Sequence, residues 1–543
     1  MRRTSKSTGK AMYVASTADR QWLRSVQRNL YLRSWEEPGY VFEKLWGLVT
    51  DPRNLRCALA RVASNRGRNT PGVDKVTVKR IVSLGIDDFL QELRRDVRSR
   101  SFRPSPVRRV MIPKRGKPGK FRPLGIPTVT DRVVQAAMKN IMEPIFEAGF
   151  LPNSYGFRPA RSAHAALEHL RLLLMPKPQT VPKADRRCAY QVAIEGDIKA
   201  CFDQIDHHGL MNRIRLKVSD PKLNRLVVAF LKAGVMSEGT FLRTETGSPQ
   251  GGILSPLLAN IALSVIEERY ARHCWPRQGK TLLSDRKKIR QRAANARHRD
   301  RTCGKPVIIP VRYADDFVLL VSVPHGPNRL QRAMAVAQQE KEELARMLRE
   351  QLGLELSPEK TLITPVTGPI RFLGHYVRFQ YHPRYGWLSN AVIPKHRSLQ
   401  LRETIKRLLH RSTCQQSLAQ RLKLINWTLR GWGHYYRHAR GAKQVFNRLD
   451  SYVWKSVRQW LRKKHDHTSM ARLAARYGWR RPARKTVYWK DGKVHLFRLC
   501  TLQVRRFDWR WLRSPDYAET SVESPVRNES RTPGSEEGAL ETA

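Results

Sequence analysis

The sequence has few acidic residues, few cysteines and no long hydrophobic run. Only 46 of its 543 residues are Asp or Glu, against 102 Lys and Arg, which gives a formal net charge of +56. This charge far exceeds what solubility needs and is typical of proteins that gather a polyanion. We therefore expect nucleic acid to be the main partner of the chain.

The distribution of cysteines and apolar residues excludes several classes of protein. The seven cysteines are scattered without a C-x-x-C pair, which excludes a disulfide framework and a cysteine-based zinc site. The longest apolar run, residues 317–323, is far below the roughly 20 residues that cross a bilayer. Residues 1–20 lack the apolar region of a secretory signal. We expect no membrane association and a reducing compartment, and a bacterial cytoplasm fits better than an organellar matrix.

The composition along the chain divides it into four segments. We expect a basic N-terminal arm over residues 1–29, a large folded part over residues 30–385, a helical part over residues 386–512 and a disordered acidic tail over residues 513–543. In the helical part apolar residues recur at steps of three and four. The tail has too few apolar residues to fold.

Two insertions interrupt the large folded part, at about residues 174–187 and 271–306. The second contains 12 Lys or Arg and two Asp. Such a run is usually a solvated loop, but in so basic a chain a nucleic-acid contact is an equal alternative. Composition alone leaves both interpretations open.

Three acidic residues stand at the ends of apolar segments. Asp315 and Asp316 lie between two apolar runs, which predicts a β-hairpin with both acids at its tight turn, and Asp197 ends another apolar strand. An Asp-Asp pair by itself is more often a solvated turn. Three carboxylates at strand ends, however, suit Mg²⁺, which prefers oxygen ligands. Two such ions about 3.5 to 4 Å apart can activate a 3′-hydroxyl and neutralise a leaving pyrophosphate, so the pattern indicates nucleotidyl transfer.

Seven motifs around these acids occur in the order of the reverse transcriptase blocks of group II intron-encoded proteins, a family that the chain resembles. The motifs are FRPLGIP, SYGFRPARSAHAAL, DIKACFDQIDH, GSPQGGILSPLLANIAL, YADDFV, LGLELSPEKT and FLGH. A later segment, WTLRGWGHYYRHA, is similar to the maturase-specific domain X of this family. The resemblance implies an α+β right-hand polymerase fold. It places fingers and palm with an antiparallel sheet over residues 30–385, and an α-helical thumb, or domain X, over residues 386–512.

The resemblance also implies roles for the acids and their neighbours. Asp197, Asp315 and Asp316 match the catalytic aspartates that bind two Mg²⁺ ions. Phe202 matches the aromatic gate that rejects a ribose 2′-hydroxyl, with plain core packing as the alternative. Gln250 in SPQGG matches the glutamine beside the incoming nucleotide.

Four basic residues are assigned to the nucleotide in the same way. Arg122 matches a triphosphate-binding arginine, and Lys120 and Arg115 are helpers on the same basic loop. Lys360 stands where a lysine could protonate the leaving pyrophosphate. The alternatives are a surface ion pair for Arg122 and a solvated charge at a helix end for Lys360.

The expected activity is RNA-directed DNA synthesis from dNTP substrates, with an RNA template and a DNA primer or target DNA. As a maturase, the protein would also bind its group II intron RNA and assist splicing and mobility. Two alternatives stay open: a non-enzymatic RNA-binding splicing maturase, and a reverse transcriptase of another element, such as a retron, a diversity-generating element or a CRISPR-associated system. Many family members carry an H-N-H endonuclease with cysteine pairs, which we expect to be missing here. A homodimer is left open.

The domain X-like segment contains an aromatic cluster, Trp427, Trp432, Tyr435 and Tyr436. Half of this cluster lies on the apolar stripe of the predicted helix, which favours a hydrophobic core over a platform for stacking RNA bases. The Arg and His residues between the aromatic residues could still contact phosphates.

Overall fold

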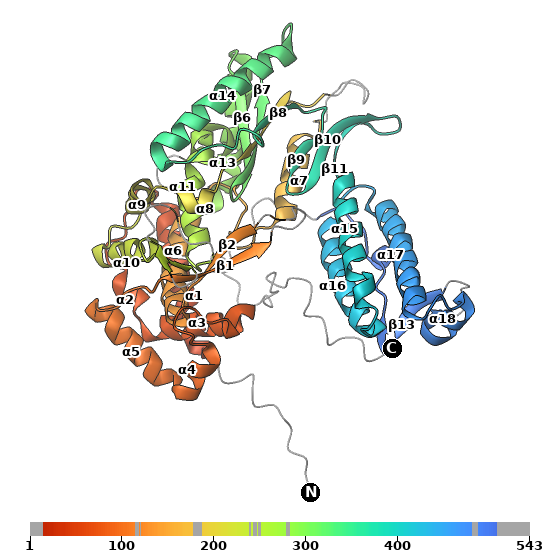
Figure 1. The fold of residues 1–543 in the computed structure, drawn as a ribbon. Coiled ribbons are helices and arrows are strands. Elements are labelled where there is room, and N and C mark those ends of the chain that lie inside the picture. Colours follow the sequence, from red (N-terminus) through yellow and green to blue (C-terminus); the bar gives the residue numbers. More distant parts are fainter. Residues whose placement is uncertain are drawn as a thin grey trace. The chain divides into compact units, whose positions relative to one another are not determined.

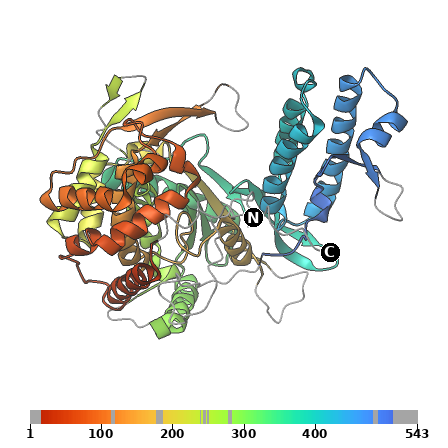
Figure 2. The ribbon, with the colours of Figure 1, turned by 90° about the horizontal axis from the view of Figure 1, so that it is seen from below.

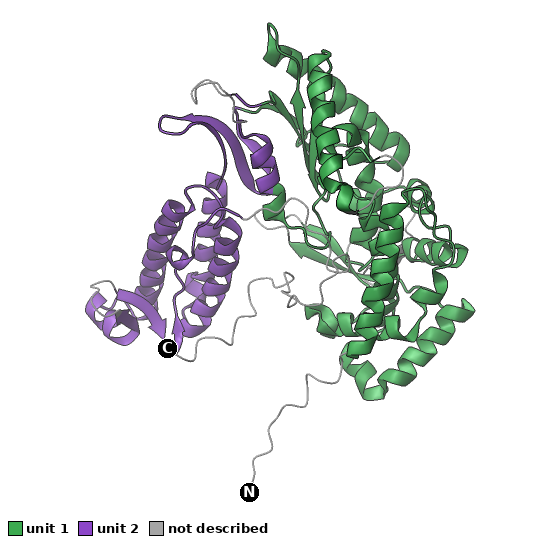
Figure 3. Ribbon diagram, turned by 180° about the vertical axis from the view of Figure 1, so that it is seen from behind, with its two compact units in different colours: residues 1–166, 189–366, 510–520 green, residues 167–188, 367–509, 521–543 purple. Residues whose placement is uncertain are grey.

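The computed structural model describes residues 15–113, 119, 121–176, 187–237, 240–242, 247, 251–277, 283–480 and 487–507. It contains two compact units (Figure 3). The first consists of residues 1–166, 189–366 and 510–520, and the second of residues 167–188, 367–509 and 521–543. None of the helices in the described part of the chain combines the length and the apolar composition of a membrane span.

The first unit begins with helices that pack around α6 (Val129–Glu147), which is buried along nearly its whole length. α1 (Thr17–Glu36) and α3 (Pro52–Ser64) both pack against α6 (Figure 1). The Ser34 hydroxyl of α1 donates to the Ile145 carbonyl of α6 at 2.8 Å. The shorter helices of this part are α2 (Trp46–Val49), α4 (Val78–Leu84) and α5 (Ile86–Ser99).

Residues 17–29 are thus helical, whereas the sequence analysis assigned them to an N-terminal arm. The Ser16 hydroxyl caps α1 by accepting from the Asp19 backbone N–H, and the Asp19 carboxylate binds Arg56 of α3. The helix escaped sequence analysis because its buried apolar residues, among them Leu30 and Trp35, all follow residue 29. Residues 1–14 lie outside the described part of the chain.

A four-stranded sheet of order β2-β1-β4-β5 follows the first helices. β1 (Val107–Pro113) and β2 (Phe121–Ile126) form an antiparallel hairpin. β4 (Val235–Ser237) pairs with β1 in parallel, and β5 (Thr240–Leu242) pairs with β4. The tip of the first hairpin, residues 114–118 and 120, is not among the described residues.

A second sheet, of order β6-β7-β3-β8, is antiparallel throughout. Its strands are β3 (Val192–Asp197), β6 (Val307–Tyr313), β7 (Asp316–Ser322) and β8 (Leu362–Pro365). The side chains of β6 and β7 are almost all buried, which explains their continuous apolar sequence. α14 (Arg329–Leu352) packs on β3, β7 and β8.

Further helices of the first unit pack mainly on other helices. α11 (Ser255–Arg269) follows the SPQGG motif and is buried along most of its length. α7 (Ala163–Leu173) starts in the first unit, where the Ser162 hydroxyl accepts from the Ala165 N–H, as expected for a cap. The others are α8 (Cys201–Gln204), α9 (His207–Arg215) and α10 (Pro221–Leu231). α11 contacts α6, α8 and α9, and α10 contacts α9.

The basic insertion at residues 271–306 is largely helical where it is described, and so it is not a loop there. It contains α12 (Ala271–Cys274) and α13 (Arg286–Thr302), and α13 packs on α12 and β6. The Asp300 carboxylate accepts from both Arg272 and His273, which fixes the end of α13. The nucleic-acid contact stays a prediction. In the other insertion, residues 177–186 are outside the described residues.

The second unit combines a β-sheet with helices that share one core. Its first strands are β9 (Ile370–Phe372), β10 (His375–His382) and β11 (Gly386–Val392), in the order β11-β10-β9. α15 (Lys395–Leu408), α16 (Leu418–Tyr436) and α17 (Ala442–Lys464) then lie side by side (Figures 1 and 2). The helical pattern predicted after Pro394 is confirmed, and so is the mixed α+β class.

Two features of the second unit differ from expectation. The chain changes unit at residues 366/367, ahead of the boundary predicted at 385/386, because the β9–β11 sheet joins the helices: the Tyr435 hydroxyl donates to the Leu373 carbonyl at 2.7 Å. The second feature is a small sheet near the end of the unit, whose strands are too short to show an alternating pattern. This sheet and the last helix comprise α18 (Met470–Tyr477), β12 (Gly478–Arg480), β13 (Val487–Asp491) and β14 (Val494–His495).

Candidate functional site

The three expected carboxylates come together at one end of the antiparallel β6-β7-β3-β8 sheet. The register of β3 and β7 places Asp197 directly opposite Asp316. Asp315 lies in the tight turn between β6 and β7, where Ala314 adopts a left-handed conformation with φ +58°. The predicted strand end and the predicted hairpin turn are both confirmed.

The Asp315 carboxyl lies in an electrostatically unfavourable position for its ionised form. Burial raises its pKa above the usual value, and the nearby charge of Asp197 raises it further. The positive charges of Lys360 and Arg312 act in the opposite direction but do not cancel the shift. A carboxylate held in this way favours the approach of a cation.

Lys360 is brought to the carboxylates by the chain that follows α14. The Ser357 N–H donates to the Asp197 carbonyl at 2.8 Å, which fixes this segment beside the end of β3. The Lys360 ammonium then forms an ion pair with the Asp197 carboxylate. The Lys360 side chain is 57% exposed, so it can also reach a solvent-borne ligand.

A buried arginine that sequence analysis missed holds the turn between β6 and β7, which carries Asp315. Arg312 of β6 has no exposed side-chain surface and pairs with Glu267 of α11. Its guanidinium also donates to the Ala314 carbonyl at 3.0 Å and to the Ser154 hydroxyl at 2.9 Å. The sequence does carry a signal for this arginine, because it is a single charged residue in an otherwise apolar strand. Such a residue is usually buried only when it is paired with a partner.

Close backbone approach at two glycines completes this packing. A Cβ on Gly156 would overlap the backbone of Ala314, and a Cβ on Gly196 would overlap the Phe317 ring. These two glycines let the segment before α7 and the end of β3 approach the hairpin that carries Asp315. Any larger residue there would displace the acids.

Phe202 is half-buried in α8, shortly after Asp197. Its ring centroid lies 6.1 Å from that of Phe157, which lies 6.5 Å from that of Tyr313. Phe157 is 49% exposed and has a left-handed backbone conformation with φ +59°, which is costly for an aromatic residue. Sequence analysis quoted the motif of Phe157 but gave this residue no role.

Only part of the expected nucleotide-binding set lies within the described residues. Arg122 is exposed on β2 opposite Ile112, and no ion pair of Arg122 is present in the described part of the chain. Lys120, Arg115 and Gln250 are outside the described residues.

The residues that flank Gln250 are fixed to the neighbouring elements. The Ile253 N–H donates to the Gln135 side chain at 2.8 Å, and a Cβ on Gly251 would overlap the Gly125 carbonyl. Gly251, just before α11, therefore lies against β2, the strand that carries Arg122.

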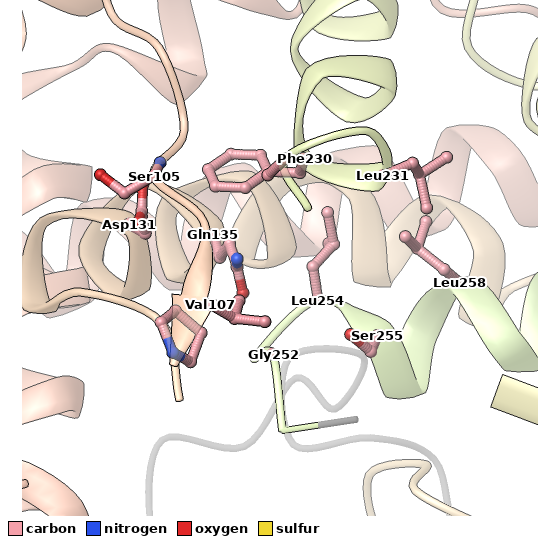
Figure 4. Close-up of a pocket in the computed structure, with 12 residues that line it drawn as sticks. Ser105, Val107, Asp131, Gln135, Phe230, Leu231, Gly252, Leu254, Ser255 and Leu258 are labelled. Atoms are coloured by element: carbon pink, nitrogen blue, oxygen red, sulfur yellow. The ribbon is translucent and has the colours of Figure 1, made fainter. Parts of the chain in front are cut away.

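A small cavity lies between α6, α10 and the start of α11 (Figure 4). Asp131, Gln135, Phe230 and Leu254 are among its lining residues. Its free volume is about 20 Å³, enough for a water molecule but not for a nucleotide. Burial raises the pKa of Asp131 to about 6. The cavity is therefore a small packing void and not a nucleotide-binding pocket.

The donor set fits a hard cation, although the residues do not form a closed cluster. In the described part of the chain, no group of three or more His, Cys, Asp or Glu side chains is arranged to hold a metal ion. The Asp197 carboxylate instead forms its ion pair with the Lys360 ammonium. Mg²⁺ nevertheless prefers carboxylate oxygens as ligands, and Asp197 and Asp316 supply them on neighbouring strands. The raised pKa of Asp315 shows that its negative charge would be stabilised by a cation.

Comparison with known proteins agrees with this geometry. Residues 112–377 match the family described as reverse transcriptase (RNA-dependent DNA polymerase), and residues 399–478 match the group II intron maturase-specific domain. The chain is 35% identical over 389 residues to protein YkfC of Escherichia coli, which covers 71% of this chain and 96% of that protein. It is 34% identical over 396 residues to the group II intron-encoded protein LtrA of Lactococcus lactis, which covers 67% of this chain and 61% of LtrA.

A third relative, of lower identity, is also named for an intron. The uncharacterized 91 kDa protein in the cob intron of Schizosaccharomyces pombe is 30% identical over 430 residues, and the alignment covers 71% of this chain and 49% of that protein. The chain thus spans 61% and 49% of the lengths of LtrA and the cob intron protein. The order of the two matched regions agrees with the order of the motifs in the sequence. The chain belongs to the reverse transcriptase/maturase family encoded by group II introns.

Proposed function

We propose that the protein synthesises DNA on an RNA template and binds a group II intron RNA to assist its splicing and mobility. The main observation that supports polymerase activity is that Asp197, Asp315 and Asp316 lie at the same end of one sheet. The proposed domains follow the two units: fingers and palm in the first unit, and thumb or domain X in the second.

The three aspartates are proposed to hold two Mg²⁺ ions. Bound there, the metal would lower the pKa of the primer 3′-hydroxyl and stabilise charge on the transferring phosphate. The protein's part is to fix the carboxylates: the β3–β7 register sets Asp197 and Asp316, and Arg312 holds the turn of Asp315. The raised pKa of Asp315 means that a cation is needed to keep this group ionised at lower pH.

The nucleotide would lie against residues that flank the carboxylates. Phe202 follows Asp197 by five residues and is proposed as the ring that excludes a ribose 2′-hydroxyl. Lys360 pairs with Asp197, and a cation bound at Asp197 would release its ammonium toward a leaving pyrophosphate. Arg122 and Gln250, with Lys120 and Arg115, are proposed to contact the dNTP from the β1–β2 hairpin and the SPQGG loop.

The second unit is proposed to bind intron RNA. A net charge of +56 implies that this binding is made largely through phosphates and falls steeply with salt. Splicing chemistry would remain with the RNA, since a maturase acts by stabilising the folded intron.

The test of this proposal is primer extension on an RNA template with Mg²⁺ and dNTPs. Wild-type protein is expected to extend the primer, and Asp315→Ala and Asp315→Asn are expected to lose extension while they retain RNA binding. A parallel reaction with ribonucleotides measures sugar selection. A folded wild type that binds RNA but never extends a primer would instead support a non-enzymatic splicing maturase.

A further inference from the structure

One aromatic residue of the second unit points away from the core that sequence analysis assigned to it. Tyr436 is buried, and Trp432 and Tyr435 pack against the same core. Trp427, on the same helix α16, is 60% exposed. Burying this indole on a partner would remove a large apolar surface from water, and an exposed Trp is often found at a binding surface.

The surroundings of Trp427 are basic. The residues that precede and follow it by about one turn, Lys423 and Arg430, are exposed on the same face of α16. α16 contains no Asp or Glu. The Arg430 guanidinium stacks over the Phe497 ring at 4.9 Å, which holds the charge in place beside the indole.

The neighbouring strand adds no free acid to this face. The Asn426 side chain bonds the His495 carbonyl and the Phe497 N–H, each at 2.7 Å, so the segment that begins with β14 runs beside Asn426, the residue before Trp427. The carboxylate of Asp491 accepts from the Ala419 N–H at 2.8 Å. Asp450 of α17 accepts from two backbone N–H groups, those of residues 499 and 500.

The face is also sterically open. Gly431 lies four residues after Trp427, and a Cβ built there would meet nothing within 4 Å. A partner can therefore reach the helix backbone beside the indole. We call the surface formed by Lys423, Trp427, Arg430 and Gly431 the Trp427 face.

We infer that the Trp427 face binds RNA at an unpaired nucleotide, with the indole stacked on the base and Lys423 and Arg430 on the flanking phosphates. The inference rests on the proposed RNA binding of the second unit and specifies where it occurs. Positive charge without acids fits a polyanion better than a protein surface of mixed charge. A flat exposed indole fits an unstacked base, because base–aromatic stacking needs one exposed face of the base and is independent of sequence.

Binding to two RNA probes tests the stacking part of this inference. The probes are a 20-nucleotide single-stranded oligo(U) and a 20-base-pair RNA duplex, each end-labelled and titrated with full-length protein at one salt concentration. Trp427→Ala should weaken binding to the single strand about tenfold, a typical loss of one stacked base, and change duplex binding by less than about twofold. Trp427→Phe should bind close to wild type. Wild-type affinity in Trp427→Ala, or an equal loss on both probes, would overturn the stacking.

A charge pair at Gly431 tests the location without disturbing the fold. Gly431→Glu and Gly431→Lys have similar size, fill open space and replace a poor helix former with a better one. Gly431→Glu should weaken binding to both RNA probes several-fold, whereas Gly431→Lys should bind at least as tightly as wild type. Equal affinities of the two variants would place the RNA elsewhere.

Primer extension on a pre-annealed RNA–DNA substrate separates this inference from the polymerase proposal. The Trp427 and Gly431 variants should extend primers with the wild-type kcat and KM, because they leave Asp197, Asp315 and the nucleotide-contacting residues unchanged and a pre-annealed substrate does not depend on the proposed contact with an unpaired nucleotide. A KM for primer–template that rises as much as the RNA Kd would assign this face to the primer–template duplex and overturn the inference. Failure of the wild type to extend would count against the polymerase alone, since RNA affinity is measured independently.

Discussion

Gly156 lies so close to Ala314 that a methyl group on Gly156 would overlap the Ala314 backbone nitrogen. The Gly156 carbonyl accepts from the Asn260 amide at 2.7 Å, and the Asn260 oxygen accepts from Arg312 at 3.2 Å. The segment before α7, helix α11 and the turn of Asp315 are therefore packed as one body. The position of the Asp315 carboxylate, which we propose to bind metal, is set by residues more than 50 positions away in the chain.

Gly156→Ala is expected to impair catalysis more than binding. The new methyl group must push the turn that carries Asp315, and a displacement of about 1 Å at a reacting group can cost about 100-fold in rate. We expect kcat for primer extension to fall by about that factor, with RNA affinity unchanged. Gly67→Ala is the control, because a Cβ there meets nothing within 4 Å. A kcat of Gly156→Ala within about threefold of wild type would contradict the packing argument.

Arg312→Met is expected to destabilise the fold strongly. Arg312 and Glu267 are fully buried, so removing one partner leaves the other charge unpaired, which typically costs about 3 to 5 kcal/mol. Urea unfolding monitored by fluorescence measures the loss. Glu267→Gln should lose a similar amount, and the double variant Arg312→Met with Glu267→Met should recover part of it. Strictly additive losses in the double variant would show that the two side chains do not interact.

Asp315→Asn is expected to stabilise the protein in the absence of divalent metal while abolishing primer extension. The folded-state pKa of Asp315 is raised above its ordinary value of 3.8 by burial and by the charge of Asp197. A raised carboxyl pKa contributes stability that is present below the unfolded value and lost as pH rises through the folded pKa. The ionised group therefore costs stability at neutral pH, and the neutral amide removes that cost.

Unfolding in EDTA and in Mg²⁺ at pH 7.5 checks this expectation. Asp315→Asn should unfold at higher urea than wild type in EDTA, and the difference should vanish near pH 3, where the wild-type carboxyl is protonated. Mg²⁺ should stabilise the wild type more than the variant, because a ligand that binds only the folded state shifts unfolding by mass action. Equal stabilisation of both proteins by Mg²⁺ would place the metal away from Asp315.

Asp131 provides a second pH-dependent prediction, away from the metal site. Burial raises its pKa to about 6, and the Thr128 hydroxyl and the Ser105 N–H bond its carboxylate. Its contribution to stability is present below pH 4 and is lost as pH rises through about 6. Relative to Asp131→Asn, the wild type should lose up to about 3 kcal/mol of unfolding free energy between pH 4 and 7.5. Parallel pH dependence of the two proteins would contradict the raised pKa.

The sequence predicted the features that local patterns encode. Asp197 and the Asp315–Asp316 pair were found because apolar runs mark strands and a polar pair between them marks a turn. Long-range packing was not predictable in this way. The partnership of Arg312 with Glu267 joins positions far apart in the chain, and no local period reports it.

Helical periodicity predicted burial less reliably for residues at the edge of an apolar stripe. Trp427 was grouped with Tyr436 as core, but the two residues lie about two and a half helical turns apart, which places them on opposite faces of α16, and the structure leaves Trp427 exposed. Likewise α1 begins at Thr17, ahead of its apolar residues, because a capping box rather than a hydrophobic pattern fixes its start. Polar contacts of this kind are specific but carry little sequence signal.

Phe157→Ala is expected to weaken discrimination against ribonucleotides. The ring of Phe157 meets that of Phe202 edge-on at 6.1 Å, so Phe157 limits how far the proposed gate can move. Without it, Phe202 gains rotamer freedom and a 2′-hydroxyl meets less resistance. The ratio of kcat/KM for dNTP over rNTP should fall several-fold in Phe157→Ala and further in Phe202→Val. Single-nucleotide incorporation on a defined template measures both ratios.

Phe157→Tyr is the matched control, because it keeps an aromatic ring and puts an aromatic residue in the same left-handed backbone conformation with φ +59°. It should discriminate like the wild type, whereas Phe157→Leu, which keeps bulk without an aromatic edge, should fall between wild type and Phe157→Ala. A general loss of activity would lower dNTP and rNTP incorporation equally and leave the ratio unchanged, so the ratio separates positioning of the gate from damage to the fold. If Phe202→Val alters the ratio and Phe157→Ala does not, the gate functions without Phe157 and its strained backbone serves only the close approach of Gly156 to the Asp315 turn.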